Sequence, residues 1–224
     1  MIFFWALLSA PVLHAESVIY QETFGNSGSA NYTVDHKAHV LTDWQVAWGR
    51  AGTKGNSTRA IVSNGASKPD AAMNIGTSNA TTSESNGLIY TDVPTNTYFF
   101  FTSAETGSAI DLDPSQGLTF GWFQRNNRLD DGFRVAVQID GLWYVTKALF
   151  SSPANAWSNQ SFTFTPAAAS WRLLEFTPGH SLAMGANPTA DLPAGRITGF
   201  GLFTEATTGE TRRFDTFSVS AGGR

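Results

Sequence analysis

Residues 117–150, GLTFGWFQRNNRLDDGFRVAVQIDGLWYVTKALF, decide the fold of this chain. Near the centre of this stretch, Asp140 and Gly141 separate two runs of β-forming residues, VQI and LWYV. Glycine accepts the positive φ that a type I′ turn demands, and the flanking residues favour strands. The pattern therefore predicts a β-hairpin that turns at Asp140-Gly141.

The hairpin has two faces, because successive side chains point to opposite sides of a strand. Counting outward from the turn gives the facing pairs Ile139–Leu142, Gln138–Trp143, Val137–Tyr144 and Arg134–Lys147. One face carries Phe133, Val135, Val137, Ile139, Leu142 and Tyr144. The other face carries Arg134, Ala136, Gln138, Trp143, Val145 and Lys147. We expect the first face to lie in a core and the second to meet a ligand.

The composition favours strands outside the hairpin as well. The chain has 224 residues, 42% of them hydrophobic, 13% aromatic and 14% charged, and Gly occurs 21 times. Aromatic and β-branched residues joined by Gly, Asn, Ser and Thr loops are typical of all-β domains. A net charge of −4 and the lack of a Lys/Arg run give no attraction to nucleic acid.

The first residues indicate export. Residues 1–15, MIFFWALLSAPVLHA, are apolar, contain the helix-breaking Pro11 and end at the small Ala15. The run is too short to span a bilayer and is typical of a signal-peptide helix, the alternative being an ordinary buried strand or helix. We expect a secreted or periplasmic product, residues 16–224, with no membrane insertion after cleavage. The chain contains no Cys, which excludes disulfides and thiol catalysis.

Short strands are expected along the whole mature chain. Besides the hairpin they cover residues 17–24, 40–48, 59–63, 87–91, 97–102, 161–165, 171–176, 196–204 and 212–220. The polar residues 64–86 and the Pro- and Gly-containing residues 177–194 are expected to be long loops. This order predicts a single domain with an antiparallel two-sheet jelly-roll β-sandwich fold.

The second face of the hairpin is the candidate binding site. Trp143 lies among Gln138, Arg134 and Lys147, which sets an aromatic plate beside hydrogen-bonding groups. Sugars suit this combination, since their C–H faces stack on aromatic rings and their hydroxyls take polar partners. Trp157, in a polar loop, is the other tryptophan expected at the surface. The alternative for Trp143 is burial beneath a covering loop.

Arg134 opposite Lys147 is a pair of like charges. Such a cross-strand pair costs a few tenths of a kcal/mol up to about 1 kcal/mol, unless an anion lies between the two. The anion is either internal, from Asp131 or Glu175, or a carboxylate or sulfate of a ligand. The second option makes an acidic polysaccharide a candidate partner.

A calcium site is expected where the chain ends meet. Glu22 lies in the first strand and Asp215 in the last, and sandwich domains commonly pair these two strands. Two carboxylates together with backbone carbonyls would suit Ca²⁺. The alternative is that either carboxylate pairs with Arg212 or Arg213.

Four segments carry a resemblance to a known class of proteins. They are ETFGNSG from residue 22, the Trp-rich segment around residues 44–48, TYFFFT from residue 97 and FDTFSV from residue 214. They resemble secreted bacterial jelly-roll domains, which include carbohydrate-binding modules and exported sandwiches with a C-terminal sorting tail. The resemblance implies glycan binding and a structural calcium near the termini, at Glu22 and Asp215.

Catalysis is the competing function. Jelly-roll lyases and glycosidases need a Tyr/His pair or paired carboxylates in a groove. His36, His39 and His180 fall in loops without metal spacing, and strict alternation places Tyr144 on the face opposite Arg134. We therefore predict a secreted, non-catalytic, carbohydrate-binding β-sandwich. The alternatives are a polysaccharide lyase or glycoside hydrolase, and a purely structural or adhesive surface protein.

Overall fold

The computed structural model describes ten segments of the chain. They are residues 16–22, 44–50, 57–60, 73–76, 87–91, 96–107, 109–128, 132–177, 180–205 and 211–222. The expected signal peptide, residues 1–15, and two of the loop histidines, His36 and His39, lie outside these segments. None of the described residues belongs to a helix long and apolar enough to cross a membrane.

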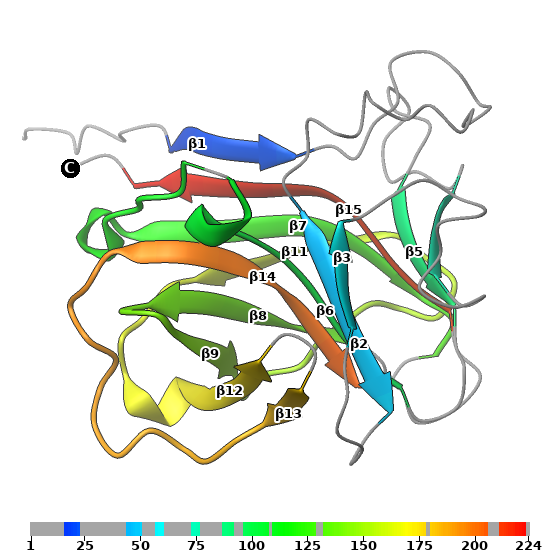
Figure 1. Cartoon of the computed structure of the whole chain (residues 1–224). Coiled ribbons are helices and arrows are strands. Elements are labelled where there is room, and N and C mark those ends of the chain that lie inside the picture. Colours follow the sequence, from blue (N-terminus) through cyan, green and yellow to red (C-terminus); the bar gives the residue numbers. More distant parts are fainter. Residues whose placement is uncertain are drawn as a thin grey trace, which may run out of the picture.

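The described segments form strands and short 3-10 turns (Figure 1). The strands are β1 (Ser17–Glu22), β2 (Gln45–Arg50), β3 (Ser57–Ala60), β4 (Met73–Gly76), β5 (Gly87–Thr91), β6 (Asn96–Ser103), β7 (Leu118–Asn126), β8 (Gly132–Ile139), β9 (Leu142–Thr146), β10 (Phe150–Ser151), β11 (Ser158–Thr163), β12 (Trp171–Thr177), β13 (Ser181–Met184), β14 (Ile197–Glu205) and β15 (Thr211–Ala221). The turns are η2 (Ala104–Thr106), η3 (Pro114–Gln116) and η4 (Ala168–Ser170).

The strands assemble into two sheets. The six-stranded sheet has the order β11-β7-β15-β5-β4, with β1 paired to β15, and the nine-stranded sheet has the order β13-β12-β9-β8-β14-β6-β2-β3, with β10 paired to β8. The ladders between the strands of both sheets are antiparallel. The predicted all-β, two-sheet antiparallel sandwich is therefore confirmed.

The first and last described strands lie side by side, as expected (Figure 1, blue and red). Ser17 pairs with Ala221, and Glu22 pairs with Phe217. This pairing leaves β1 at the edge of the six-stranded sheet, with Val18 60% exposed.

The main core fills the space between the two sheets. Trp44 is fully buried there and packs edge-on against Phe217, with ring centroids 5.1 Å apart. Its indole Nε1 donates a hydrogen bond to the hydroxyl of Tyr20 at 2.6 Å, which satisfies the buried donor. Trp122 and Trp171 are also buried in this core, so these tryptophans serve packing.

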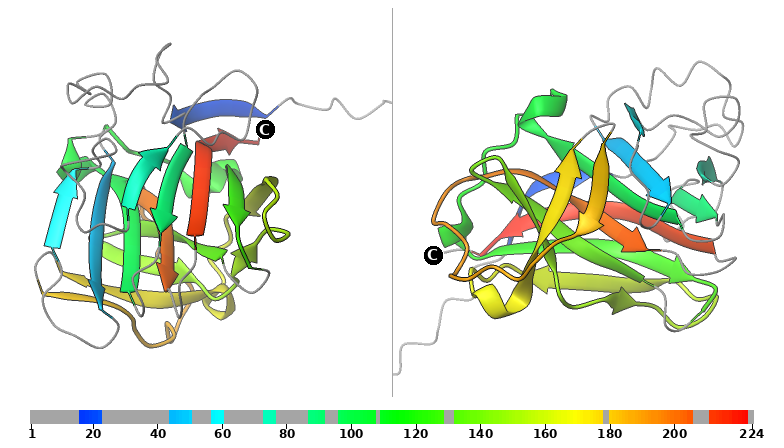
Figure 2. Two further views of the ribbon diagram at one scale, coloured as in Figure 1. Left: turned by 90° about the vertical axis from the view of Figure 1, so that its right-hand side faces the viewer. Right: turned by 60° about the horizontal axis from the view of Figure 1, so that its bottom comes forward.

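A second, smaller core lies on the opposite face of the nine-stranded sheet. The sheet curls, so that β13, at one end of the strand order, contacts β6 and β2 near the other end (Figure 2, right). The buried members of this second core are Ala47, Phe99, Phe101, Ala136, Trp143, Val145, Leu174, Leu182 and Phe203. Both faces of β6 are therefore buried, in keeping with the uninterrupted aromatic run of its sequence TYFFFT.

Two strands lie where loops were expected. β4 falls within residues 64–86 and pairs with β5, and β13 falls within residues 177–194 and pairs with β12. Both strands are only four residues long, so neither shows a usable period in the sequence. The missed β13 decides the environment of the candidate site.

Candidate functional site

The hairpin at Asp140-Gly141 has the predicted register. Gln138 pairs with Trp143, and Val137 pairs with Tyr144. Both turn residues have positive φ, 51° at Asp140 and 76° at Gly141, as a type I′ turn requires. The first face of the hairpin is buried in the main core, apart from the 54% exposed Leu142 beside the turn.

The expectation that Trp143 lies on an open face is wrong. Its side chain is only 7% exposed, and its ring meets Phe99 and Phe101 edge-on at 4.8 Å and 5.6 Å between centroids. The reason is the curl of the sheet, because β12 and β13 cover the face on which Trp143 lies. Trp143 thus has no open ring face on which a sugar could stack.

Gln138, the cross-strand partner of Trp143, is buried as well, with 3% of its surface exposed. Its amide oxygen accepts a hydrogen bond from the Thr198 hydroxyl at 3.2 Å. Gln138 therefore belongs to the interior in this structure.

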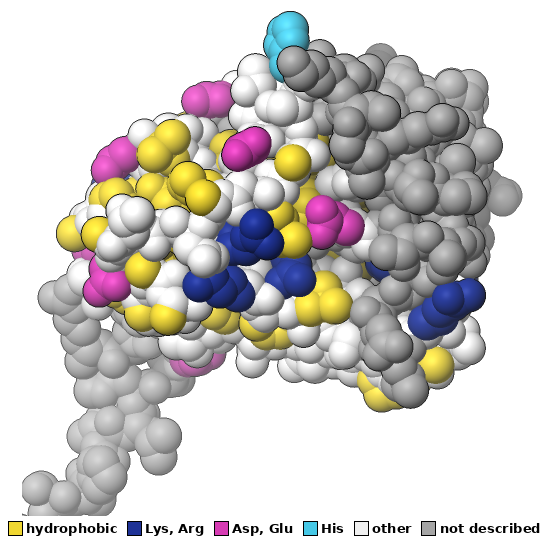
Figure 3. Space-filling view, turned by 90° about the horizontal axis from the view of Figure 1, so that it is seen from below, with side chains coloured by type: hydrophobic (Ala, Val, Ile, Leu, Met, Phe, Trp, Pro, Cys, Tyr) yellow, Lys and Arg dark blue, Asp and Glu magenta, His cyan; other side chains and the backbone are white. Residues whose placement is uncertain are grey.

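The two cations predicted for the site do line a hollow. A cavity of about 350 Å³ is bordered by Arg134, Lys147, Arg172, Met184 and Asn187, and we call it the basic pocket. Figure 3 shows Lys and Arg side chains gathered on the face seen from below, which is the side of β12 and β13 in Figure 1. The net charge of the chain is −4, so this positive hollow is a local feature.

Backbone carbonyls hold the two guanidinium groups of the basic pocket in place. Arg134 Nη1 donates to the carbonyl oxygen of Thr146 at 3.1 Å and to that of Lys147. Arg172 donates to the carbonyl oxygen of Gly185 from Nε at 2.9 Å and from Nη2 at 2.6 Å. The arginines are thereby pre-oriented, which lowers the entropic cost of binding a ligand.

The charges of the basic pocket act on one another. Burial lowers the pKa of Arg134, the negative charge of Glu205 partly opposes this effect, and the neighbouring Arg172 adds to it. Arg134 is still a cation at neutral pH, because the guanidinium group is a very strong base. Arg134 and Arg172 therefore repel each other, and an anion between them would relieve that repulsion.

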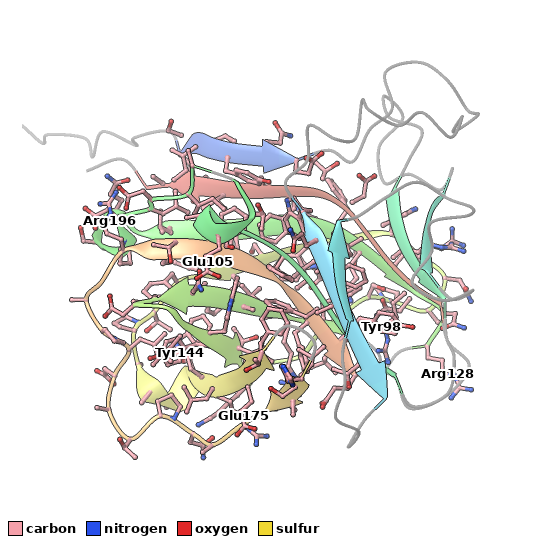
Figure 4. The ribbon with its side chains drawn as sticks, in the orientation of Figure 1. Tyr98, Glu105, Arg128, Tyr144, Glu175 and Arg196 are labelled. Carbon is pink, nitrogen blue, oxygen red and sulfur yellow. The ribbon has the colours of Figure 1, made fainter. Side chains whose placement is uncertain are left out.

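Of the two internal anions considered from the sequence, the structure tests only Glu175. Glu175 is exposed on β12, and no ion pair between it and Arg134 or Lys147 occurs in the described part of the chain. Figure 4 shows Glu175 at the lower end of the ribbon. Asp131, the other candidate, lies outside the described residues.

Trp157 lies elsewhere in the fold. It is half-buried in the connection between β10 and β11, and β11 is the edge strand of the six-stranded sheet. The structure does not bring it to Trp143 or to the basic pocket. Conversely, Arg172, Met184 and Asn187 were missed, because only the pairing of β12 with β9 and β13 places them beside Arg134.

The predicted metal ligands lie on paired strands. Glu22 is opposite Phe217, and Asp215 lies two residues before Phe217 in β15. Asp215 is fully buried, and its Oδ1 accepts a hydrogen bond from the Thr216 hydroxyl at 3.2 Å. Two carboxylates on neighbouring strands suit Ca²⁺ in ligand type, although the described residues include no group of three or more His, Cys, Asp or Glu placed to hold a metal ion. The calcium site stays a prediction.

The residues weighed for catalysis do not converge. Tyr144 is 5% exposed in the main core, on the opposite side of the sheet from the basic pocket. Burial raises its pKa, with the charge of Asp140 adding to the effect, so the phenol is neutral at physiological pH. His180 is exposed at the turn that precedes β13.

Comparisons with known proteins bear on the fold. No protein-family model matches the sequence, and a search of curated proteins gives no match. Among solved structures, the family 11 carbohydrate-binding module of a cellulosomal cellulase of Clostridium thermocellum matches with a TM-score of 0.50 and 12% identity, covering 92% of this chain and 97% of that one. The same module in complex with a β-1,3-1,4-mixed-linked tetrasaccharide matches with a TM-score of 0.47 and 13% identity, over 81% and 89% of the two chains.

A larger protein gives a weaker match. A Clostridium thermocellum xylanase fragment with a family 22 module and a catalytic module, complexed with xylohexaose, has a TM-score of 0.40 and 12% identity over 68% of this chain and 25% of that one. At such identities a match speaks for the fold alone. The predicted jelly-roll architecture is confirmed, and this chain is similar in fold to the family 11 module.

Proposed function

We propose that this chain is a secreted, non-catalytic carbohydrate-binding module that binds an acidic polysaccharide at the basic pocket. One observation carries the proposal: Arg134, Lys147 and Arg172 surround a hollow of about 350 Å³ with no carboxylate among its lining residues. The jelly-roll fold, which this chain has in common with a family 11 carbohydrate-binding module, supports it. In this proposal Trp143 supports the pocket from within and does not touch the glycan.

The lining of the basic pocket suits a sugar that carries a carboxylate or a sulfate. The guanidinium group of an arginine can donate two parallel hydrogen bonds to a carboxylate, and Lys147 adds an exposed point charge. Met184 offers an apolar wall to the C–H face of the ring, and the exposed amide of Asn187 can bond a hydroxyl. The acidic group would occupy the position between the two arginines where an anion relieves repulsion.

Affinity electrophoresis in gels that contain polygalacturonate, alginate or chondroitin sulfate tests the proposal. The Lys147→Gln and Arg172→Gln variants should bind roughly tenfold more weakly, since a hydrogen bond to a charged group contributes about 1.5–3 kcal/mol. Lys147→Arg keeps the charge and should retain binding, and added salt should weaken it. Arg196→Gln is the matched control, because Arg196 is an exposed arginine outside this pocket.

Equal retention of the wild type and a Lys147→Gln/Arg172→Gln double variant would refute the proposal. Its non-catalytic part is tested separately. The protein is incubated with the same polysaccharides, and the solution is assayed for new reducing ends and for the absorbance of unsaturated uronate. A turnover-dependent signal would support the lyase or hydrolase alternative instead.

A second candidate function is a purely structural or adhesive surface protein. The burial of Trp143 at 7% exposure favours it, because the aromatic residues of the nine-stranded sheet then serve packing alone. This candidate predicts no retention on any of the three acidic gels and none on neutral gels of hydroxyethyl cellulose. The export route, including any sorting tail, stays a prediction from the sequence.

A further inference from the structure

A second cavity, of about 400 Å³, shares no lining residue with the basic pocket. It is bordered by Asp113, Pro114, Ser115, Phe164, Pro166, Asp191, Leu192, Pro193 and Ala194, and we call it the proline pocket. These residues come from η3 and its cap, from the connection between β11 and η4, and from the connection between β13 and β14. Arg196, labelled in Figure 4, lies two residues beyond this lining.

Hydrogen bonds join the three segments that form the proline pocket. The Leu192 amide donates to the Pro166 carbonyl at 2.8 Å, which ties two of the walls together. Leu112 and Ile197 exchange backbone hydrogen bonds of 3.0 Å and 2.9 Å, which fix the third wall. The prolines also restrict the backbone, so the walls are held in place before any ligand binds.

Backbone amides aim both carboxylates of the proline pocket. Asp191 Oδ1 accepts from the Ala168 amide at 2.9 Å, and Asp113 Oδ1 accepts from the Ser115 amide at 2.9 Å. A carboxylate oriented through one bond still has lone pairs for a second donor. The Asp191 carboxylate can therefore accept a hydroxyl from a ligand.

The remaining lining is apolar. Leu192 is 5% exposed and belongs to the main core, so packing fixes this part of the pocket lining. Phe164 is half-buried and packs on Trp171, with ring centroids 5.8 Å apart. Aromatic and proline surfaces of this kind suit the C–H faces of a pyranose ring.

The charge of the proline pocket selects against an acidic ligand. The carboxylates of Asp113 and Asp191 would repel a uronate or a sulfate. Arg196 partly compensates Asp113 and so weakens the attraction for a cation at that end of the pocket: its Nη1 lies 3.7 Å from Asp113 Oδ2, and its Nε lies 2.6 Å from Asp111 Oδ1. A neutral, hydroxyl-rich molecule with an apolar face matches the site best.

We infer that the proline pocket binds a neutral sugar residue, a hydroxyl donating to Asp191 and its C–H face lying against Phe164 and the prolines. This site is independent of the basic pocket and has the opposite charge. The chain would thus hold a glycan, or two glycans, through two chemically different sites.

The experiment uses the amides that orient the carboxylates as reporters. In ¹⁵N–¹H correlation spectra, neutral tetrasaccharides of glucose, xylose and galactose are added in turn, with a glucosamine tetramer and a galacturonate tetramer as charged probes. We expect the Ala168 and Ser115 amide resonances to shift with at least one neutral tetrasaccharide. The apparent Kd should weaken about tenfold in Asp191→Ala.

Two further variants keep the outcome interpretable. Asp191→Asn preserves an acceptor for the Ala168 amide, so it should weaken binding less than Asp191→Ala and leave the melting temperature unchanged. Glu105→Gln is the matched control, because Glu105 is an exposed acid of η2 that lines neither pocket. Figure 4 shows Glu105 apart from Arg196.

The inference is overturned if no neutral tetrasaccharide shifts these amides, if only the glucosamine tetramer does, or if Asp191→Ala leaves the shifts unchanged. Its failure is distinguishable from that of the proposed function. Lys147→Gln/Arg172→Gln should abolish retention on acidic gels and leave the Ala168 and Ser115 shifts intact.

Discussion

Trp143→Ala separates a tryptophan that supports the fold from one that binds ligand. The indole is 7% exposed and meets Phe99 and Phe101 edge-on within the second core. A Trp side chain buries about 150–250 Å². At about 25 cal/mol per Å², its removal forfeits roughly 4–6 kcal/mol of transfer free energy.

The expected loss is somewhat smaller than that upper estimate. Area calculations refer to an extended unfolded chain and overstate the burial, and measured Trp→Ala losses in cores are about 3–5 kcal/mol. We therefore expect Trp143→Ala to lower the free energy of unfolding by about 4 kcal/mol. In a domain of this size that corresponds to a fall in melting temperature of roughly 8–16 °C.

The assay is thermal and urea unfolding followed by circular dichroism, together with retention on acidic gels. Trp143→Phe keeps an aromatic ring against Phe99 and should destabilise less. Trp157→Ala is the matched control, because Trp157 is half-buried and belongs to neither hydrophobic core. If Trp143→Ala melts at the wild-type temperature yet loses glycan retention, the indole is a binding platform and our placement of it is wrong.

Three further predictions concern Gly199, Tyr144 and the expected calcium site. Gly199→Ala should lower the free energy of unfolding in urea by about 1–3 kcal/mol, since a Cβ there would lie 2.8 Å from the Trp143 ring. An unchanged urea midpoint would mean that the second core is loosely packed. Burial raises the pKa of Tyr144, so its ionisation opposes folding and stability falls as the pH rises above about 10. Between about pH 8 and pH 10.5 the free energy of unfolding should therefore fall less in Tyr144→Phe than in the wild type. Equal falls in the two proteins would contradict this. If Glu22 and Asp215 hold Ca²⁺, EDTA should lower the melting temperature, and an identical melting curve with and without EDTA would speak against the ion.

Local sequence was sufficient for the hairpin and for the class of fold. The Asp140-Gly141 turn needs positive φ at both positions, and the alternating residues on either side then determine which side chains face each other. The pairing of the first and last strands was also predicted correctly. These features depend on neighbouring residues or on a general property of sandwiches, so the sequence predicts them.

Only the tertiary structure decided which surface is open. The alternation of the hairpin places Trp143 and Arg134 on the same face, and no local feature of the sequence shows which of the two side chains is buried. The curl of the nine-stranded sheet brings the four-residue β13 over that face, where Leu182 and Met184 join the second core that buries Trp143, whereas Arg134 lines the basic pocket with Arg172. Such a contact joins strands that are distant in the sequence, and its energy comes from apolar area that is buried only once the sheet has closed. For that reason the residue types at the site could be read from the sequence, whereas their exposure depended on the folded sheet.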